Sequence, residues 1–121
     1  MIVKVIHHSL GSDTDNTLVA SVTVEKFTDP YDALEFAFFR TQNIEDSWSN
    51  PQRNGEPNKD GGKEVKVEAP LFCDDDGKTY GLRSSMVGDY FQVENDFYIC
   101  KAFGFKPCDP VNYNPNPSEA I

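Results

Sequence analysis

The stretch from residue 79 to residue 105 constrains the fold most, because short apolar runs alternate there with turn-forming residues. It reads TYGLRSSMVGDYFQVENDFYICKAFGF. The Gly88-Asp89 pair precedes one apolar run, and the Asn95-Asp96 pair separates that run from the next. Apolar runs between such pairs are typical of strands that fold back on their neighbours. The stretch therefore predicts a β-hairpin.

Three further segments have the composition of strands. Residues 2–6 (IVKVI) and 18–24 (LVASVTV) are rich in β-branched residues, which favour extended backbone. The polar cluster at residues 11–16 between them can form the turn of an antiparallel pair. Residues 63–71 (KEVKVEAPL) alternate charged with small apolar residues, which is the period of a half-exposed strand.

A helix is predicted between about Pro30 and Thr41. Thr28 or Asp29 can accept hydrogen bonds from its first free amides, and a proline suits the first helical position. At roughly 100° per residue, one face carries the residues expected to pack on the sheet. These residues are Ala33, Leu34, Ala37, Phe38 and Thr41.

Two phenylalanines, Phe36 and Phe39, lie on the other side of this helix. Large apolar side chains on the outer face of a helix require a cover of some kind. Either the rest of the chain covers them, with Trp48 or the C-terminal tail as the cover, or they form an exposed patch for another protein. Both alternatives agree with the sequence.

Together these segments predict one α+β domain over residues 1–106, with an antiparallel sheet of about five strands and one main helix packed on a face. Residues 74–78 (DDDGK) are predicted to form a turn. Asn, Pro and Gly dominate residues 49–62, which predicts a mobile loop. The tail at residues 107–121 contains four prolines and three asparagines, which predicts an extended arm.

The chain is acidic, with 20 Asp and Glu against 11 Lys and Arg and a formal net charge of −9. Binding to a phosphate backbone needs clustered Lys and Arg, so direct binding of DNA or RNA is not expected. A basic partner would be attracted, and a protein that itself binds nucleic acid is such a partner. The alternative is that the charge only keeps the protein soluble.

The cysteines and the lengths of the apolar runs indicate in which cellular compartment the protein is expected. Cys73, Cys100 and Cys108 cannot all be paired and form no CxxC motif, which favours a reducing, cytosolic setting. The apolar run at the N-terminus is too short for a signal peptide, and no run approaches the roughly 20 residues that span a bilayer. Neither export nor a membrane is expected.

The acidic run at residues 74–77 invites comparison with a calcium-binding EF-hand loop, in which a glycine follows acidic ligands. Aligning Gly77 with the glycine of that loop places Phe72 at the first ligand and Arg83 where a glutamate is needed. The register therefore excludes this calcium site and favours a solvated turn. No metal is expected.

Histidine, cysteine and arginine are the remaining candidates for chemistry. His7 and His8 are adjacent, so in a strand they point to opposite faces and cannot jointly chelate one ion. No phosphate-binding loop and no nucleophile elbow occur, so neither a cofactor nor an enzyme is expected. An enzyme that uses Arg83, one of the histidines and Cys100 is an alternative, and it requires these side chains to share one pocket. Arg83 could also clamp an anion, close an internal ion pair or cap a turn.

The run YGLRSSMVGDYFQV, followed by FYICKAFGF, resembles a pattern in small uncharacterised proteins of phages, plasmids and their bacterial hosts. The segment DPYDALEFAFFRTQNIEDSW is similar to the preceding segment of the same proteins, so the resemblance covers about residues 1–106. Its most specific positions are Tyr80, Arg83, Ser84, Val87, Gly88, Asp89, Gly104 and Phe105. The resemblance implies a mobile-element origin and action in the cytoplasm of a bacterial host, and it implies no known activity.

Small acidic proteins of phages frequently bind a host protein, so resemblance and charge lead to one functional expectation. The chain is expected to bind and inhibit a host nucleic-acid-binding protein, as an anti-CRISPR or anti-restriction protein that mimics nucleic acid. The alternative is a non-inhibitory accessory protein of phage or plasmid replication, transcription or assembly. The residues expected to bind the partner are Phe36, Phe39, Asp74, Asp75, Asp76, Asp89, Glu94 and Asp96.

Overall fold

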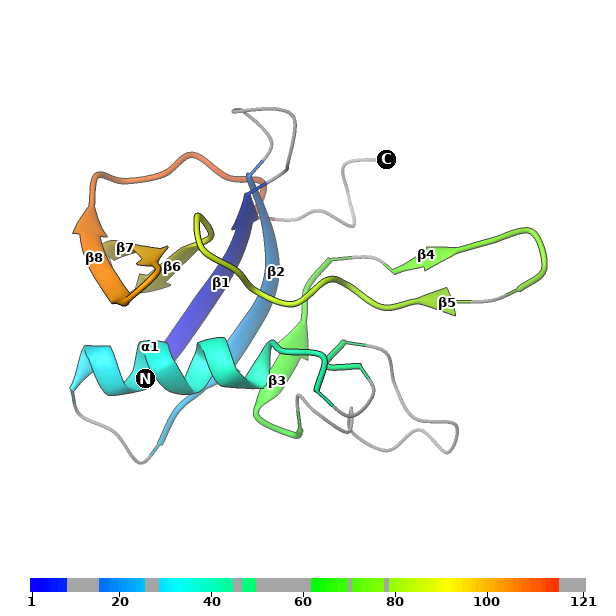
Figure 1. Ribbon diagram of the computed structural model, residues 1–121, viewed down its shortest axis with the longest axis horizontal. Coiled ribbons are helices and arrows are strands. Elements are labelled where there is room, and N and C mark those ends of the chain that lie inside the picture. Colours follow the sequence, from blue (N-terminus) through cyan, green and yellow to red (C-terminus); the bar gives the residue numbers. More distant parts are fainter. Residues whose placement is uncertain are drawn as a thin grey trace.

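Over the residues that the structure describes, one helix and a set of antiparallel strands make up the fold (Figure 1). The computed structural model describes residues 1–8, 16–25, 29–44, 47–49, 62–69, 71–77 and 79–115. In chain order the elements are β1 (Ile2–His8), β2 (Asn16–Thr23), α1 (Pro30–Arg40), β3 (Val65–Val67), β4 (Phe72–Cys73), β5 (Thr79–Tyr80), β6 (Tyr90–Val93), β7 (Asp96–Lys101) and β8 (Gly104–Cys108). The larger sheet has six strands in the order β3-β2-β1-β6-β7-β8, and β4 and β5 form a separate pair.

The predicted opening pair of strands is confirmed as β1 and β2, which are neighbours inside the sheet, with β2 beside the outer strand β3. Val3 pairs with Val22 and Val5 with Ala20. The register then shifts between Val5 and Ile6, because β2 carries one extra residue there. Such a bulge increases the local twist of a strand. The predicted turn between the strands lies outside the described residues, apart from its last position.

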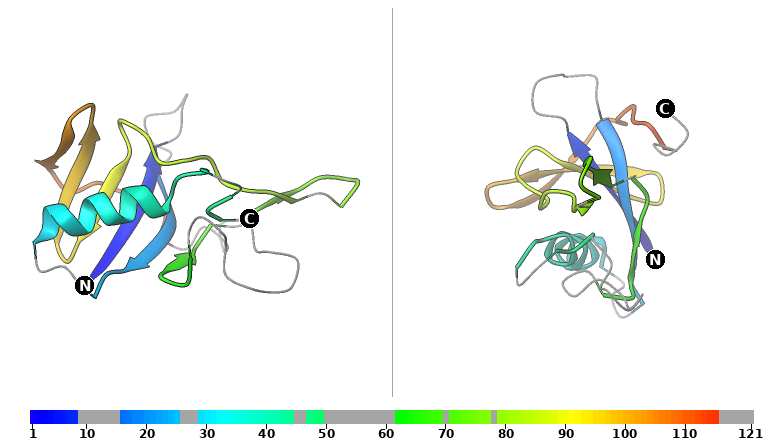
Figure 2. Two further views of the ribbon diagram at one scale, coloured as in Figure 1. Left: turned by 60° about the horizontal axis from the view of Figure 1, so that its bottom comes forward. Right: turned by 90° about the vertical axis from the view of Figure 1, so that its right-hand side faces the viewer.

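The predicted helix is also confirmed. Asp29 caps it, since its carboxylate accepts a hydrogen bond of 2.8 Å from the amide of Tyr31. Thr41 follows its last residue, and its hydroxyl donates to the carbonyl of Ala37. Of the five residues predicted to face the sheet, four are buried and Phe38 is partly buried against the core. The helix therefore packs along one face of the sheet (Figure 2).

The predicted C-terminal hairpin is confirmed as β6 and β7, and the structure adds a strand that was not predicted. β8 follows a tight turn at residues 102–103 and pairs with β7 from Lys101 opposite Gly104 to Phe97 opposite Cys108. The sheet thus has six strands, where about five were expected. β8 also extends past residue 106, the predicted end of the domain, into the first two residues of the predicted tail.

The described part of the tail is docked on the strands and does not extend freely. Asn114 forms a parallel bridge with Thr17 of β2, with hydrogen bonds of 2.9 Å to the carbonyl of Asn16 and 3.1 Å from the amide of Leu18. The hydroxyl of Tyr113 donates to the Gln92 side chain over 2.9 Å. Up to residue 115, the tail expected to be an extended arm therefore lies against the sheet without forming a helix or strand beyond β8.

The pair β4–β5 projects from the body at the end opposite to the start of α1 (Figures 1 and 2). Residues 74–77 turn the chain between the two strands, with Gly77 at φ 82°, so the predicted turn is confirmed over these residues. The predicted loop at 49–62 lies outside the described residues except at its two ends. Within the described ranges no helix is long and apolar enough to cross a membrane.

Candidate functional site

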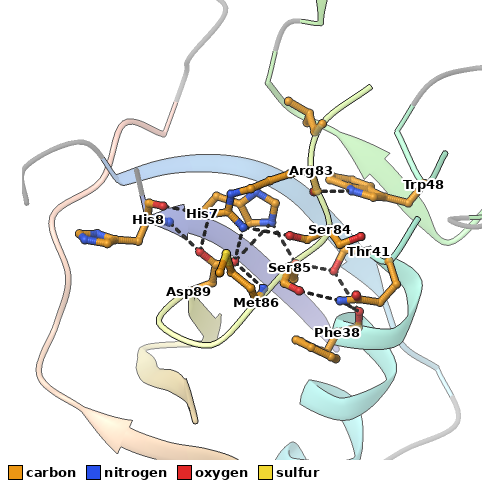
Figure 3. A network of polar contacts seen from close by, with 12 residues as sticks. His7, His8, Phe38, Thr41, Trp48, Arg83, Ser84, Ser85, Met86 and Asp89 are labelled. Atoms are coloured by element: carbon orange, nitrogen blue, oxygen red, sulfur yellow. Dashed lines mark hydrogen bonds and ion pairs between the residues drawn. The ribbon is translucent and has the colours of Figure 1, made fainter. Parts of the chain in front are cut away.

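The loop between β5 and β6, residues 81–89, crosses the sheet beside the C-terminal end of α1 (Figure 3). The hydroxyl of Ser49 accepts from the amide of Leu82 over 2.7 Å. The indole of Trp48 donates to the carbonyl of Arg83 over 2.8 Å. The amide of Ser85 donates to the carbonyl of Thr41 over 2.9 Å. These bonds hold the loop against the segment that follows the helix.

Arg83 and Asp89 form a bidentate ion pair at the centre of this loop. The two guanidinium nitrogens of Arg83 donate to the two carboxylate oxygens of Asp89 over 2.8 and 2.7 Å. The same carboxylate accepts from the backbone amides of His8 and Met86, over 2.9 and 2.8 Å. Four donors thus satisfy a carboxylate that is only 1% exposed. Arg83 therefore closes an internal ion pair, one of the roles predicted for it.

Asp89 was expected to contact a partner, and this expectation is wrong. Its side chain is buried beneath the loop, and its acceptor positions are occupied by groups of the same chain. A partner could reach it only by displacing the loop and breaking the ion pair. Asp89 is thus part of the fold and absent from the accessible surface.

His7 extends the polar network toward α1. Its Nε2 lies 2.9 Å from the hydroxyl of Ser85, which lies 2.7 Å from the hydroxyl of Thr41. Burial lowers the pKa of His7 from its ordinary value of 6.5 to about 4, against the opposing effect of Asp89 and with a small further contribution from Arg83. The ring is therefore neutral at pH 7 and acts as a hydrogen-bonding group in the interior.

Ser85, His7 and Asp89 bring together the three residue types of a hydrolytic triad, but not its geometry. In a triad, the serine and the carboxylate contact opposite nitrogens of the imidazole. Here the Ser85 hydroxyl and Asp89 Oδ2 both approach Nε2, at 2.9 and 3.8 Å. All three side chains are buried. The arrangement is that of a packed structural network.

The alternative enzyme hypothesis named Arg83, a histidine and Cys100. The structure does bring these residues around Asp89, since the amide of Cys100 donates to the carbonyl of Asp89 over 2.9 Å. Asp89, His7 and Cys100 are buried, however, and the described residues that line the 520 Å³ cavity near α1 include none of them and not Arg83. His8 points away from His7, with its Nδ1 2.7 Å from the side-chain oxygen of Asn16. In the described part of the chain, no three His, Cys, Asp or Glu side chains are grouped to hold a metal ion.

Phe36 and Phe39, the aromatic residues expected to bind a partner, have different surroundings. Phe36 is partly buried, and the guanidinium of Arg40 lies over its ring at 5.2 Å from the centroid. Phe39 is 57% exposed. Trp48, one expected cover for these rings, is fully buried in the core. The alternative in which the rest of the chain covers both rings is therefore wrong for Phe39.

Phe39 belongs to an exposed face of the helix that we call the α1 surface, composed of Tyr31, Asp32, Glu35 and Phe39. All four residues are exposed, and helical geometry places them within a sector of about 100°. In the described part of the chain, neither of its two carboxylates forms an ion pair. Tyr31, Asp32 and Glu35 were not among the predicted binding residues, although the spacing of four between Tyr31, Glu35 and Phe39 contains the signal.

The turn between β6 and β7 carries further negative charge near the N-terminal end of α1. Tyr31 and Tyr98 stack edge to face with ring centroids 5.6 Å apart. The pKa of Tyr98 is raised first by burial and then by Asp96, with smaller effects from Tyr31 and Asp29. Asp96 and Asp29 thus lie within electrostatic reach of one phenol. Glu94 and Asp96 are both exposed, as predicted binding residues would have to be.

The predicted acidic binding residues do not form one group. Asp75 and Asp76 are exposed and Asp74 is partly buried, and all three lie in the turn of the β4–β5 pair. This turn is at the opposite end of the molecule from the start of α1 (Figure 1). The accessible members of the predicted acidic set therefore fall into two separate regions.

Comparison of the chain with protein-family models, with curated proteins and with solved structures finds no match. What the fold and the site define is an acidic α+β protein with a six-stranded antiparallel sheet and an internal Arg83–Asp89 ion pair. The exposed surface is therefore the part of the molecule that bears on its function.

Proposed function

We propose that this chain is a small acidic protein of phage type that binds and inhibits a host protein which itself binds nucleic acid. The α1 surface is the observation that carries the proposal. It combines two exposed aromatic rings with two carboxylates that form no ion pair within the described residues. The resemblance of residues 79–105 to proteins of mobile elements supports the phage-type origin.

The chemistry of the α1 surface matches a basic partner. Asp32 and Glu35 lie about one helical turn apart and can accept hydrogen bonds from Lys or Arg side chains that otherwise contact phosphates. Tyr31 and Phe39 flank them, and aromatic rings at the centre of an interface supply much of the binding free energy once water is excluded. Aromatic anchors and acceptors thus lie on one rigid element.

The charge distribution around this surface favours the same partner. Asp29, Glu94 and Asp96 are exposed near the N-terminal end of α1 and extend the negative region beyond the helix. The whole chain carries a net charge of −9, which repels nucleic acid and increases the association rate with a basic protein. Because the charges are exposed, salt should weaken the association.

Affinity capture with a matched pair of variants tests this proposal. The tagged chain would be incubated with bacterial lysate at low and at high salt, alongside Glu35→Lys and Asp75→Lys. Both variants change the charge equally, but Asp75 lies on the distant β4–β5 turn. We expect the wild type and Asp75→Lys to recover the same nucleic-acid-binding protein at low salt, and Glu35→Lys to recover little of it.

A gel-shift assay with the captured protein then tests inhibition. Addition of the wild-type chain should displace nucleic acid from the captured protein, and Glu35→Lys should displace much less. Recovery of no specific partner would overturn the proposal, as would a partner whose nucleic-acid binding is unaffected. Recovery of phage proteins alone would favour the non-inhibitory accessory role.

A further inference from the structure

A cavity of about 520 Å³ lies where the C-terminal half of α1 meets the end of β2 and the residues before β3. A volume of this size is typical of sites for small ligands. The described residues that line it are Thr23, Val24, Glu25, Phe36, Arg40, Lys63 and Glu64. None of them belongs to the Arg83–Asp89 network or to the α1 surface.

Arg40 is the residue that most needs explanation in this cavity. Its Nε is buried and has no hydrogen-bond acceptor, which is costly for a group that carries positive charge. Its guanidinium lies over the ring of Phe36 at 5.2 Å. This contact orients the planar group but accepts none of its hydrogen bonds. The side chain is therefore held in place while its Nε donor has no acceptor.

Among the described residues, no carboxylate of the same cavity forms a direct ion pair with Arg40, although the side chains of Glu64 and Arg40 both reach Gly62. Glu25 and Glu64 both line the cavity, yet within the described ranges neither forms an ion pair with Arg40 or with Lys63. The backbone of Glu64 is fixed, because its carbonyl accepts from the amide of Thr23 over 2.9 Å. In a chain with a net charge of −9, an arginine that lies beside two carboxylates and forms no direct ion pair within the described residues is unexpected. The separation of these charges fits a ligand that carries both signs.

The composition of the walls narrows the ligand class. Arg40 and Lys63 offer two positive charges, Glu25 and Glu64 offer two negative ones, and Phe36 with Val24 supplies apolar surface. A phosphate or a nucleotide would place two or more negative charges beside the two glutamates and would be repelled. A ligand with one carboxylate, one ammonium group and an apolar part would complement the positive, negative and apolar lining residues in turn.

We propose that this cavity binds a zwitterionic amino acid or short peptide with an apolar side chain. Its carboxylate would accept hydrogen bonds from Arg40, in the planar geometry that guanidinium and carboxylate share. Its ammonium would face Glu25 and Glu64, and its side chain would pack on Phe36. The proposal is independent of partner binding at the α1 surface.

Titration of the isotope-labelled chain, followed by amide NMR shifts, provides the test. The probes are L-leucine, L-phenylalanine and the dipeptide leucyl-phenylalanine, each compared with its C-terminal amide and its N-acetyl form. We expect saturable shifts around the cavity for at least one free zwitterion. Amidation should weaken its binding about tenfold or more, because it removes the charged acceptor. Acetylation should also weaken it, and the amino acid and dipeptide arms distinguish the two ligand sources.

A charge-matched pair of variants assigns the binding to Arg40. Arg40→Gln should weaken the affinity for the bound probe at least tenfold. Lys101→Gln removes the same charge on β7, remote from the cavity lining, and should leave that affinity unchanged. Thermal unfolding checks that both variants fold. If Arg40→Gln does not fold, the amide comparison on the wild type decides. Absence of saturable binding by all probes, or equal binding of the amide, would overturn the proposal.

Discussion

The guanidinium of Arg83 donates two parallel hydrogen bonds, of 2.8 and 2.7 Å, to the carboxylate of Asp89, although the two residues are six positions apart in a loop without regular structure. Backbone amides of His8 and Met86 complete the coordination of the carboxylate. The pair therefore joins β1 to the loop that follows β5. Its removal should loosen the loop and uncover the sheet beneath.

Asp89→Asn is expected to lower the free energy of unfolding by about 3 kcal/mol, because a buried pair that loses one partner leaves the other charge uncompensated. The new amide would also face a donor of Arg83 or Met86 with its own NH₂ group. Urea denaturation measures the change. Asp75→Asn, on the exposed β4–β5 turn, should change the unfolding free energy by less than about 0.5 kcal/mol. Equal effects of the two substitutions would contradict a structural role for the pair.

Acid should destabilise the protein through His7. The unfolded chain takes up a proton near pH 6.5, whereas the folded chain resists protonation until about pH 4, because burial lowers the His7 pKa. Between these values the unfolded state binds more protons, so stability falls as pH falls, by about 3 kcal/mol in total. Urea denaturation across this range measures the slope.

His7→Gln removes this titration and keeps a polar group within reach of Ser85. The variant should show a shallower loss of stability between pH 6.5 and pH 4 than the wild type, whatever its stability at pH 7. An unchanged slope would mean that other groups, chiefly carboxylates, cause the acid sensitivity.

Trp48 should contribute to stability through its indole nitrogen as well as its volume. Trp48→Phe deletes the 2.8 Å hydrogen bond to the carbonyl of Arg83 and leaves that carbonyl without this donor. A loss of about 2 kcal/mol in unfolding free energy is expected, from the unsatisfied acceptor together with the space left by the smaller ring. Tyr113→Phe deletes a bond to Gln92 that is only partly buried. Tyr113→Phe should lower the free energy of unfolding by clearly less than Trp48→Phe does. A larger loss in Tyr113→Phe would argue against this role for Trp48.

Phe39 should matter for partner binding and little for folding. Phe39→Ser is expected to weaken the captured complex by about tenfold or more, since truncation of an aromatic anchor typically costs over 1 kcal/mol. Phe103→Ser is the matched control, because Phe103 is 97% exposed in the turn between β7 and β8. Surface plasmon resonance with the partner measures both variants. The same loss in each would indicate general hydrophobic attraction and no defined site on α1.

Sequence periodicity predicts the parts of this fold in which local pattern and final burial agree. The strands β1 and β2, which are rich in β-branched residues, and the capped helix α1 were predicted within two residues at each end. β8 was missed because Gly104 and Pro107 interrupt its short pattern, and both are unfavourable in a strand interior. Pairing with β7 across a tight turn outweighs this weak preference.

The site was predictable to a smaller extent, since its contacts join residues far apart in the chain. An internal ion pair was one of the roles considered for Arg83, but nothing in the local sequence names Asp89 as its partner. Ser85 meets His7 across 78 positions and Thr41 across 44, and no periodicity relates them. The α1 surface is different in this respect, because its four residues lie on one helix and their spacing in the sequence is enough to predict that they share a face.

The two outer strands of the sheet bear on how the molecule behaves when concentrated. β3 has only three residues, and β8 contains Pro107, which lacks an amide hydrogen, and the exposed Lys106. Short length, proline and lysine at a sheet border all hinder the addition of a strand from another molecule. The chain thus presents poor templates for fibril growth at either border of its largest sheet.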